Sequence, residues 1–161
     1  MPTLRPFRAL RFDAATGDLS SLLAPPYDII SPGERQTLLA RDPHNIVRVE
    51  LPADLGEAGP DDYLGAAAVA AAWRDSGVLV KDEAPTVTVH EMRWDDAEGQ
   101  TQTATGQLAR LQLEEYGPGA GVLPHEKTHG GPKQDRYALL EATQLNTSPL
   151  VFLAGSEPAQ T

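Results

Sequence analysis

The stretch Thr86-Val87-Thr88-Val89-His90-Glu91-Met92-Arg93-Trp94 alternates between polar and apolar side chains over most of its length. Successive side chains of a β-strand point to opposite faces, so this alternation predicts a strand. A second alternating run covers residues 101–113, and Asp95 to Gln100 between the two runs has the composition of a turn. Together the two runs predict an antiparallel β-hairpin.

Three helices are predicted around the hairpin. Ser31, Pro32 and Glu34 form the pattern of a capped helix start, in which serine caps, proline takes the first helical position and glutamate reaches back to the cap amide. The alanine-rich segment 61–76 has high helix propensity, and segment 132–144 is the third expected helix. One stripe of the alanine-rich helix is expected to face the core, formed by Tyr63, Ala66, Ala70 and Trp73.

Three other segments are expected to be strands: 7–12, 45–51 and 150–153. Helices that interleave with strands and one antiparallel hairpin predict a compact α+β domain with a mixed sheet, covering residues 1–154. Residues 155–161 are expected to form a flexible tail. A free edge at strand 150–153 would favour self-association by pairing with another chain.

The composition excludes several classes of protein. The 161 residues carry 13 Lys and Arg against 23 Asp and Glu, which gives a net charge of −10, and they contain no cysteine. The absence of cysteine excludes disulfide scaffolds, Cys-ligated metal sites and thiol nucleophiles. The acidic charge disfavours docking on nucleic acid or anionic lipid, and no signal peptide or membrane-spanning run is visible. We therefore expect a soluble cytoplasmic protein with neither nucleic-acid nor membrane partners.

His125-Glu126-Lys127-Thr128-His129 matches the H-E-x-x-H pattern of zinc proteases. That chemistry needs both histidines on one helix face, with the glutamate as general base. Pro124 precedes the segment and Gly130-Gly131-Pro132 follows it, and these residues disfavour a helix there. Metal-dependent hydrolysis through His125, Glu126 and His129 is therefore the less favoured hypothesis.

The next segment, Gly130-Gly131-Pro132-Lys133-Gln134-Asp135-Arg136, predicts an anion site. Glycines that lead into a helix whose first residue is Pro132 leave main-chain N–H groups free to bind a phosphate or carboxylate. Lys133 and Arg136 lie three residues apart, so both can project from the first turn towards one ligand. The alternative is that the two cations form surface ion pairs with Glu126, Asp135 or Glu141.

Tyr27-Asp28 follows the stiff dipeptide Pro25-Pro26. A carboxylate on such a loop can orient a metal ion, a hydroxyl or an imidazole, which makes Asp28 a candidate catalytic residue. Asp28 can equally cap the turn that leads to the helix after Ser31, because aspartate commonly bonds nearby amides. Both interpretations stay open.

Three stretches resemble a bacterial and archaeal family catalogued as domain of unknown function 1015: Arg5–Leu10, Ala24–Ser31 and Leu123–Phe152. The third stretch contains the family-like residues His125, Glu126, Thr128, Pro132, Lys133, Asp135, Arg136, Leu145, Asn146, Ser148 and Pro149. Segment 45–52 also fits, and the order and spacing agree across essentially the whole chain.

The resemblance implies that family members extend beyond this chain and carry a Gly-His-His-Arg motif there. That motif is similar to the phosphate-contacting turn of the ParB/sulfiredoxin-like fold, whose relatives include a free-serine kinase and nucleotide-binding partition proteins. Because this sequence lacks the motif, it is expected to be the N-terminal part of a family member, a shortened product or a diverged single-domain form. The resemblance implies a fold and a site, and no reaction.

Two functions follow as hypotheses. The first is binding of a nucleotide with Mg²⁺, or of another phosphorylated small molecule, as in a kinase of serine-like substrates. Lys133, Arg136 and nearby amides would hold the phosphate, Glu126 or Asp28 would position Mg²⁺ or act as base, and His125 would donate to an oxygen. Further candidate ligand-binding residues are Tyr27, Thr128, Gly131 and Asp135.

Because the arginine-containing turn is missing, the chain alone is expected to be weak or inactive as a kinase. The second hypothesis is a non-enzymatic module that senses a ligand or takes part in an assembly. Neither the substrate nor a reaction follows from the residues.

Overall fold

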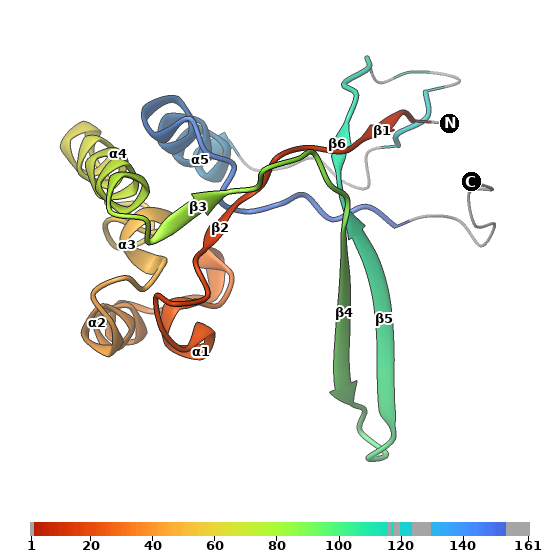
Figure 1. The fold of residues 1–161 in the computed structure, drawn as a ribbon, viewed down its shortest axis with the longest axis horizontal. Helices are drawn as coiled ribbons and strands as arrows, with labels where there is room; N and C mark the ends of the chain where they lie inside the picture. The colour runs from red at the N-terminus through yellow and green to blue at the C-terminus, as the bar shows by residue number, and fades with distance from the viewer. Residues whose placement is uncertain (1, 116, 118–119, 124–129, 154–161) are drawn as a thin grey trace. The chain divides into compact units, whose positions relative to one another are not determined.

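The computed structural model describes residues 2–115, 117, 120–123 and 130–153 of the chain. Figure 1 shows a mixture of helices and short strands, which confirms the α+β class. In chain order the elements are β1 (Leu4–Arg5), β2 (Leu10–Phe12), α1 (Leu19–Leu22), the 3-10 helix η1 (Tyr27–Ile29), α2 (Pro32–Arg41), α3 (Val47–Glu50), α4 (Pro60–Asp75), β3 (Leu79–Lys81), β4 (Thr88–Asp95), β5 (Thr101–Leu108), β6 (Arg110–Leu111) and α5 (Gly130–Thr143).

The chain divides into two compact units. The first unit contains residues 1–18 and 70–134, and the second contains residues 19–69 and 135–161. One of the three boundaries lies just before α1, and the other two fall inside α4 and α5, each of which is one continuous helix.

The named strands all belong to the first unit and pair as three antiparallel ribbons: β1 with β6, β2 with β3, and β4 with β5. The β4–β5 ribbon is the predicted hairpin, and the turn between its strands contains Gly99 at φ +76°, a conformation that glycine adopts without steric cost. The second run of the hairpin is divided, because β5 ends at Leu108 and β6 pairs with β1. The opening strand is also shorter than predicted, with β2 at Leu10–Phe12 and a single bridge between Phe7 and Thr86.

The second unit holds a hydrophobic core made by α2, α3 and the loop before α2. Ile30, Leu38, Val47 and Leu51 are buried together. The predicted helix start is confirmed: the Ser31 hydroxyl accepts from the Glu34 amide, and the Glu34 carboxylate accepts from the Ser31 amide. This reciprocal pair fixes where α2 begins and which side of it faces the core.

The other two predicted helices are confirmed as α4 and α5. Gly77, at φ +80°, follows α4, which agrees with the predicted stop. Helix α5 starts at Gly130, two residues before the predicted first position, so Pro132 lies within its first turn. Proline is tolerated there because the first amides of a helix have no partner inside it.

The strand predicted at 45–51 is wrong, because α3 occupies Val47–Glu50. Asn45 is fully buried; its amide group donates to the carbonyls of Ser21 and Leu23, and its side-chain oxygen accepts from the Val47 amide. These bonds turn the backbone at Asn45 into one helical turn. Tertiary contacts therefore override the alternating pattern, as is common for short apolar segments.

The strand predicted at 150–153 is also wrong. These residues have no regular secondary structure, no named strand pairs with them, and Leu150, Val151 and Leu153 are 82%, 86% and 96% exposed. An apolar run becomes a strand only where a neighbouring strand accepts its main-chain hydrogen bonds. The edge strand expected to drive self-association is therefore absent from the described part of the chain, and self-association itself stays a prediction.

Within the described ranges, no helix is long and apolar enough to cross a membrane. The predicted tail at 155–161 lies outside the described residues.

Candidate functional site

The candidate site lies around Arg136, in the second turn of α5. Its guanidinium carbon lies 3.9 Å from the centroid of the Tyr27 ring, a cation–π contact. The guanidinium also donates from Nη1 to the Glu50 carbonyl at 2.9 Å and to Glu50 Oε1 at 3.3 Å. Arg136 is thereby fixed between η1 and α3, with 21% of its side chain exposed.

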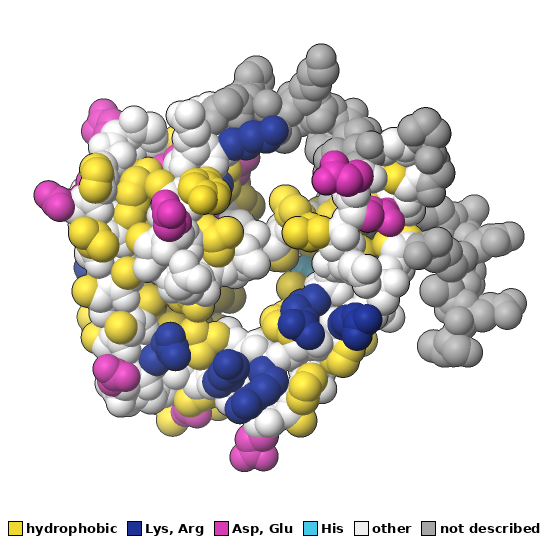
Figure 2. All heavy atoms as spheres, turned by 90° about the horizontal axis from the view of Figure 1, so that it is seen from above, with side chains coloured by type: hydrophobic (Ala, Val, Ile, Leu, Met, Phe, Trp, Pro, Cys, Tyr) yellow, Lys and Arg dark blue, Asp and Glu magenta, His cyan; other side chains and the backbone are white. Residues whose placement is uncertain are grey.

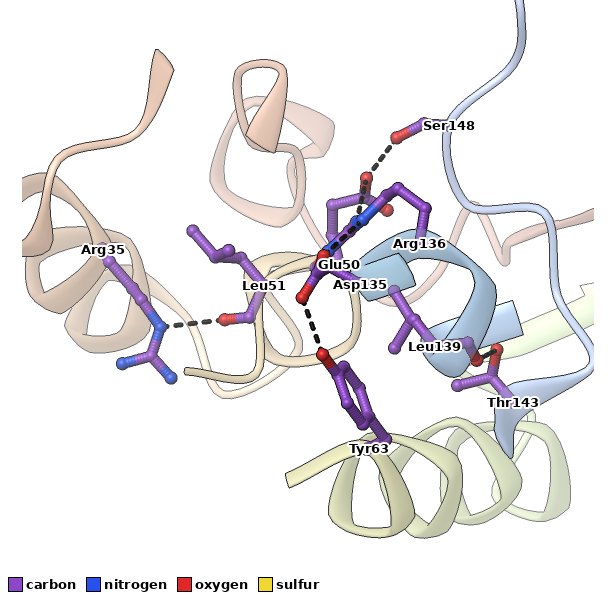
Figure 3. A network of polar contacts seen from close by, with 9 residues as sticks. All are labelled: Arg35, Glu50, Leu51, Tyr63, Asp135, Arg136, Leu139, Thr143 and Ser148. Carbon is purple, nitrogen blue, oxygen red and sulfur yellow. Dashed lines mark hydrogen bonds and ion pairs between the residues drawn. The ribbon is translucent and has the colours of Figure 1, made fainter. Parts of the chain in front are cut away.

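Asp135 is the second partner of Arg136. Its Oδ2 accepts from Nε at 2.8 Å and from Nη2 at 2.5 Å, while its Oδ1 accepts from the Tyr63 hydroxyl at 2.7 Å (Figure 3). Both oxygens of this carboxylate are thus committed to protein donors. Burial, together with the hydrogen bond to Asp135, raises the pKa of Tyr63 to about 12, so its hydroxyl stays protonated at neutral pH.

Glu50 is the most buried charged residue of the site, with 7% of its side chain exposed. Its Oε1 accepts from Arg136 and from the Ser148 hydroxyl (Figure 3). Its Oε2 is buried and has no hydrogen-bond partner among the described residues. An unsatisfied buried acceptor costs about 1–3 kcal/mol, so Oε2 favours a donor brought by water or by a bound molecule.

The formal charges of the site are one guanidinium and two carboxylates, which sum to −1. The guanidinium of Arg136 has five N–H groups. Four of them donate to Asp135 or Glu50: the Nε hydrogen, both Nη1 hydrogens and one Nη2 hydrogen. The second Nη2 hydrogen has no partner among the described residues. The arrangement can therefore orient a ligand by a single cationic donor. It cannot supply a strong base, since the carboxylates are paired and Tyr63 is protonated.

The first turn of α5 offers a different chemistry. It contains no acidic residue, and Gly131 and Lys133 are exposed. The first amides of an α-helix have no intrahelical partner and carry partial positive charge. Lys133 forms no ion pair with any residue of the described ranges, whereas Arg136 does so with Asp135 and Glu50.

Two predicted site residues, Gly131 and Lys133, are exposed in the first turn of α5, and the others fall into three groups. Tyr27, Asp135 and Arg136 are brought together. Asp28 lies beside Tyr27 in η1 and is exposed, and among the described residues no hydrogen bond joins it to the Arg136 network. The remaining candidates lie outside the described residues: His125, Glu126, Thr128 and His129.

The hypothesis of zinc hydrolysis stays untested for the same reason. Within the described ranges, no group of three or more His, Asp or Glu side chains could hold a metal ion.

An open cleft of about 570 Å³ borders the network where the start of α4 faces the middle of α5. It is lined by Pro60, Tyr63, Leu64, Ala138, Glu141 and Ala142. Its walls are mostly apolar, and Tyr63 connects it to Asp135. This volume lies in the range of small-molecule sites.

Sequence reasoning missed three residues of the network. Glu50 was assigned to a strand, Tyr63 to the core-facing stripe of α4, and Ser148 was noted only for its resemblance to a family motif. A glutamate between the apolar residues Val49 and Leu51 is the signal that could have found Glu50, because a buried carboxylate needs a cationic partner.

The chain was compared with known families, curated proteins and solved structures. The profile of one family, described as "Protein of unknown function (DUF1015)", matches residues 4–161. The chain belongs to the DUF1015 family. The match covers nearly all of the chain, including every described residue of the Arg136 network.

No curated protein and no solved structure matches the chain. The expected likeness to the ParB/sulfiredoxin-like fold therefore stays a prediction, and membership of DUF1015 assigns no activity.

Proposed function

We propose that this DUF1015 chain binds a nucleotide or another phosphorylated small molecule, with the phosphate at the first turn of α5. The observation that carries the proposal is the exposed Lys133 in the first turn of α5, a turn without acidic residues. The first amides of a helix have no partner inside the helix, so they add donors beside this cation. Helix N-termini with an adjacent cation are favourable positions for phosphate.

The arrangement of carboxylates supports the same proposal. In a chain of net charge −10, acidic side chains near the start of α5 would repel a phosphate. The carboxylate nearest in sequence, Asp135, is instead neutralised by Arg136 and bonded by Tyr63.

The proposal extends to phosphoryl transfer onto a small hydroxyl-bearing acceptor. This reaction depends mainly on positioning and charge neutralisation, for which the first turn of α5 offers the cation Lys133. His125 and Glu126 as proton donor and base, and Asp28 as a ligand of nucleotide-bound Mg²⁺, are the roles expected from the sequence.

Calorimetry and thermal unfolding test the binding. MgATP, MgADP and phosphoserine should bind and raise the melting temperature, whereas adenosine and serine should not. A ligand at 100 times its Kd adds about 2.7 kcal/mol of stability. Lys133→Met should abolish this gain without changing the melting temperature of the free chain, while Arg74→Met in the last turn of α4 should leave it intact.

Mass spectrometry of serine-like acceptors incubated with ATP or ADP tests the transfer. We expect little turnover from this chain by itself. Turnover that survives Arg136→Ala would contradict the role given to Arg136. Equal binding of phosphorylated and unphosphorylated ligands would contradict the proposal as a whole.

A second candidate function is an assembly module. The apolar residues Leu150, Val151, Phe152 and Leu153 are 53% to 96% exposed. Consecutive exposed apolar side chains favour association with another surface. Sedimentation velocity of the chain and of a Val151→Asp variant tests this function. A concentration-dependent oligomer that becomes monomeric in the variant would support it. A monomer in both proteins would exclude it.

A further inference from the structure

The first unit contains a surface cleft of about 420 Å³, separate from the Arg136 network. Its lining comes from three segments that are distant in sequence: Phe7 and Arg8, Lys81 and Pro85, and Arg110. Three of the five lining residues are cations, and a fourth, Phe7, is a half-buried aromatic residue. Figure 2 shows several Lys and Arg side chains gathered near one another on the visible face.

The cations of this cleft have no carboxylate partners in the described part of the chain. The ion pairs of the first unit join Arg11 to Asp82 and Arg93 to Glu91. Asp82 is the acidic residue that follows Lys81 directly, yet its carboxylate accepts from Arg11 at 2.9 Å and from the Ala9 amide at 3.3 Å. The cleft therefore keeps a formal charge of +3 in a chain of net charge −10.

Arg8 is oriented in advance. Its Nε donates to the Asp82 carbonyl at 2.6 Å, which leaves both terminal nitrogens of the guanidinium without a described partner. A guanidinium fixed by its Nε presents the remaining N–H groups as a fork. That fork matches two oxygens of one phosphate group.

A like-charge pair lies beside the cleft. Arg5 in β1 is directly opposite Arg110 in β6. Cross-strand neighbours have Cβ atoms about 4.5–5.5 Å apart, and like charges at that distance destabilise the pair. Neither arginine has an acidic partner within the described ranges, so a bound anion is the means by which this repulsion would be relieved.

We infer that this cleft binds a phosphate chain of two or three phosphoryl groups, free or attached to a nucleoside. Three separated cations match several charged oxygens rather than one carboxylate, and the volume suits a small molecule rather than a polymer. The Phe7 ring offers a stacking surface for a base, if the chain of phosphates carries one. The inference is independent of the phosphate site proposed at α5.

Calorimetry with tripolyphosphate as the probe tests the inference on the full chain. Tripolyphosphate should bind at least tenfold more tightly than orthophosphate or sulfate. An Arg8→Gln, Arg110→Gln double variant should weaken this binding at least tenfold, and Arg93→Gln, which removes an arginine of the hairpin, should change it less than twofold. Lys133→Met should leave it unchanged, which separates this cleft from the α5 site.

The melting temperature of the free double variant provides the folding control. It should stay within about 4 °C of that of the unaltered chain, because removal of the Arg5–Arg110 repulsion offsets the loss of the hydrogen bond from Arg8 to the Asp82 carbonyl. If the double variant does not fold, Arg110→Gln alone should still weaken tripolyphosphate binding several-fold.

Two comparisons identify the source of the phosphate chain. ATP that binds more tightly than tripolyphosphate, with the difference lost in Phe7→Leu, supports a nucleotide; equal affinities support a free phosphate chain. Equal binding of orthophosphate and tripolyphosphate would overturn the inference. An oligoglutamate peptide that binds more tightly than tripolyphosphate, with the same loss in the double variant, would also overturn it.

Discussion

Replacing Arg136 by methionine is the perturbation that separates the stabilising role of this residue from ligand binding. Methionine keeps much of the aliphatic volume and removes the charge. Glu50 and Asp135, with 7% and 14% of their side chains exposed, would then be left without their cation. Removing one partner of a buried ion pair lowers the free energy of unfolding by about 3–5 kcal/mol. Because Arg136 is partly exposed, we expect a loss near the lower figure, about 3 kcal/mol.

Urea denaturation, followed by tryptophan fluorescence and circular dichroism, measures this loss. At this chain length about 1 kcal/mol corresponds to a shift of about 2–4 °C, so the melting temperature should fall by roughly 6 °C or more. Lys133→Met is the matched control on the same helix. Because Lys133 is exposed, we expect that change to stay within about 0.5 kcal/mol.

A double variant tests whether the loss of stability comes from the unpaired charge of Glu50. In the Arg136→Met background, Glu50→Gln should recover at least about 1 kcal/mol, because the glutamine amide is uncharged when buried and still accepts from Ser148. In the unaltered background the same change should be destabilising. Loss of less than about 1 kcal/mol in Arg136→Met, or no recovery in the double variant, would refute the network as a source of stability.

Three further predictions concern the fold and its titrating groups. Ser31→Ala should lower the free energy of unfolding by about 1 kcal/mol, measured by urea denaturation. Hydrogen bonds from Ser31 hold the pKa of Glu34 below 4.5, so the stability difference between serine and alanine should shrink as the pH falls below 4.5. A difference that grows instead would contradict the capping box. An ultraviolet titration should show one tyrosine ionising near pH 12, and this ionisation should be absent in Tyr63→Phe. The stability that Tyr63 contributes should be lost as the pH rises from 10 towards 12. Ionisation of every tyrosine near pH 10 would contradict the bond to Asp135. Leu139→Ala, at a side chain 2% exposed, should cost about 2–5 kcal/mol in the same denaturation assay, and a loss below about 1 kcal/mol would mean that α5 does not contribute to the core.

Local signals predicted the elements that local interactions determine. The Ser31–Glu34 capping box, the alanine-rich α4 and the β4–β5 hairpin each carry their signal within a few neighbouring residues. The starts of these elements followed within two residues, whereas β5 ends at Leu108, five residues before the end of the predicted run. The segment 45–51 failed because buried hydrogen bonds from Asn45 to distant carbonyls, invisible in the local pattern, determine its backbone.

The candidate site was predicted in part for a similar reason. Asp135 and Arg136 were found because they stand together at a helix start, and Tyr27 because it follows two prolines. Tertiary folding alone joins the other bonded pairs: Glu50 and Arg136 are 86 residues apart along the chain, and Tyr63 and Asp135 are 72 apart. Ser148, which bonds Glu50, is 98 residues from it. No spacing rule connects residues so far apart.

Backbone amide NMR of the chain titrated with MgADP tests the proposed phosphate site most directly. We predict that the largest shift changes occur at Gly131 and Lys133, that they saturate with added nucleotide, and that Lys133→Met abolishes them. Saturating shifts confined to other parts of the chain, or none at millimolar nucleotide, would contradict a phosphate site at the start of α5.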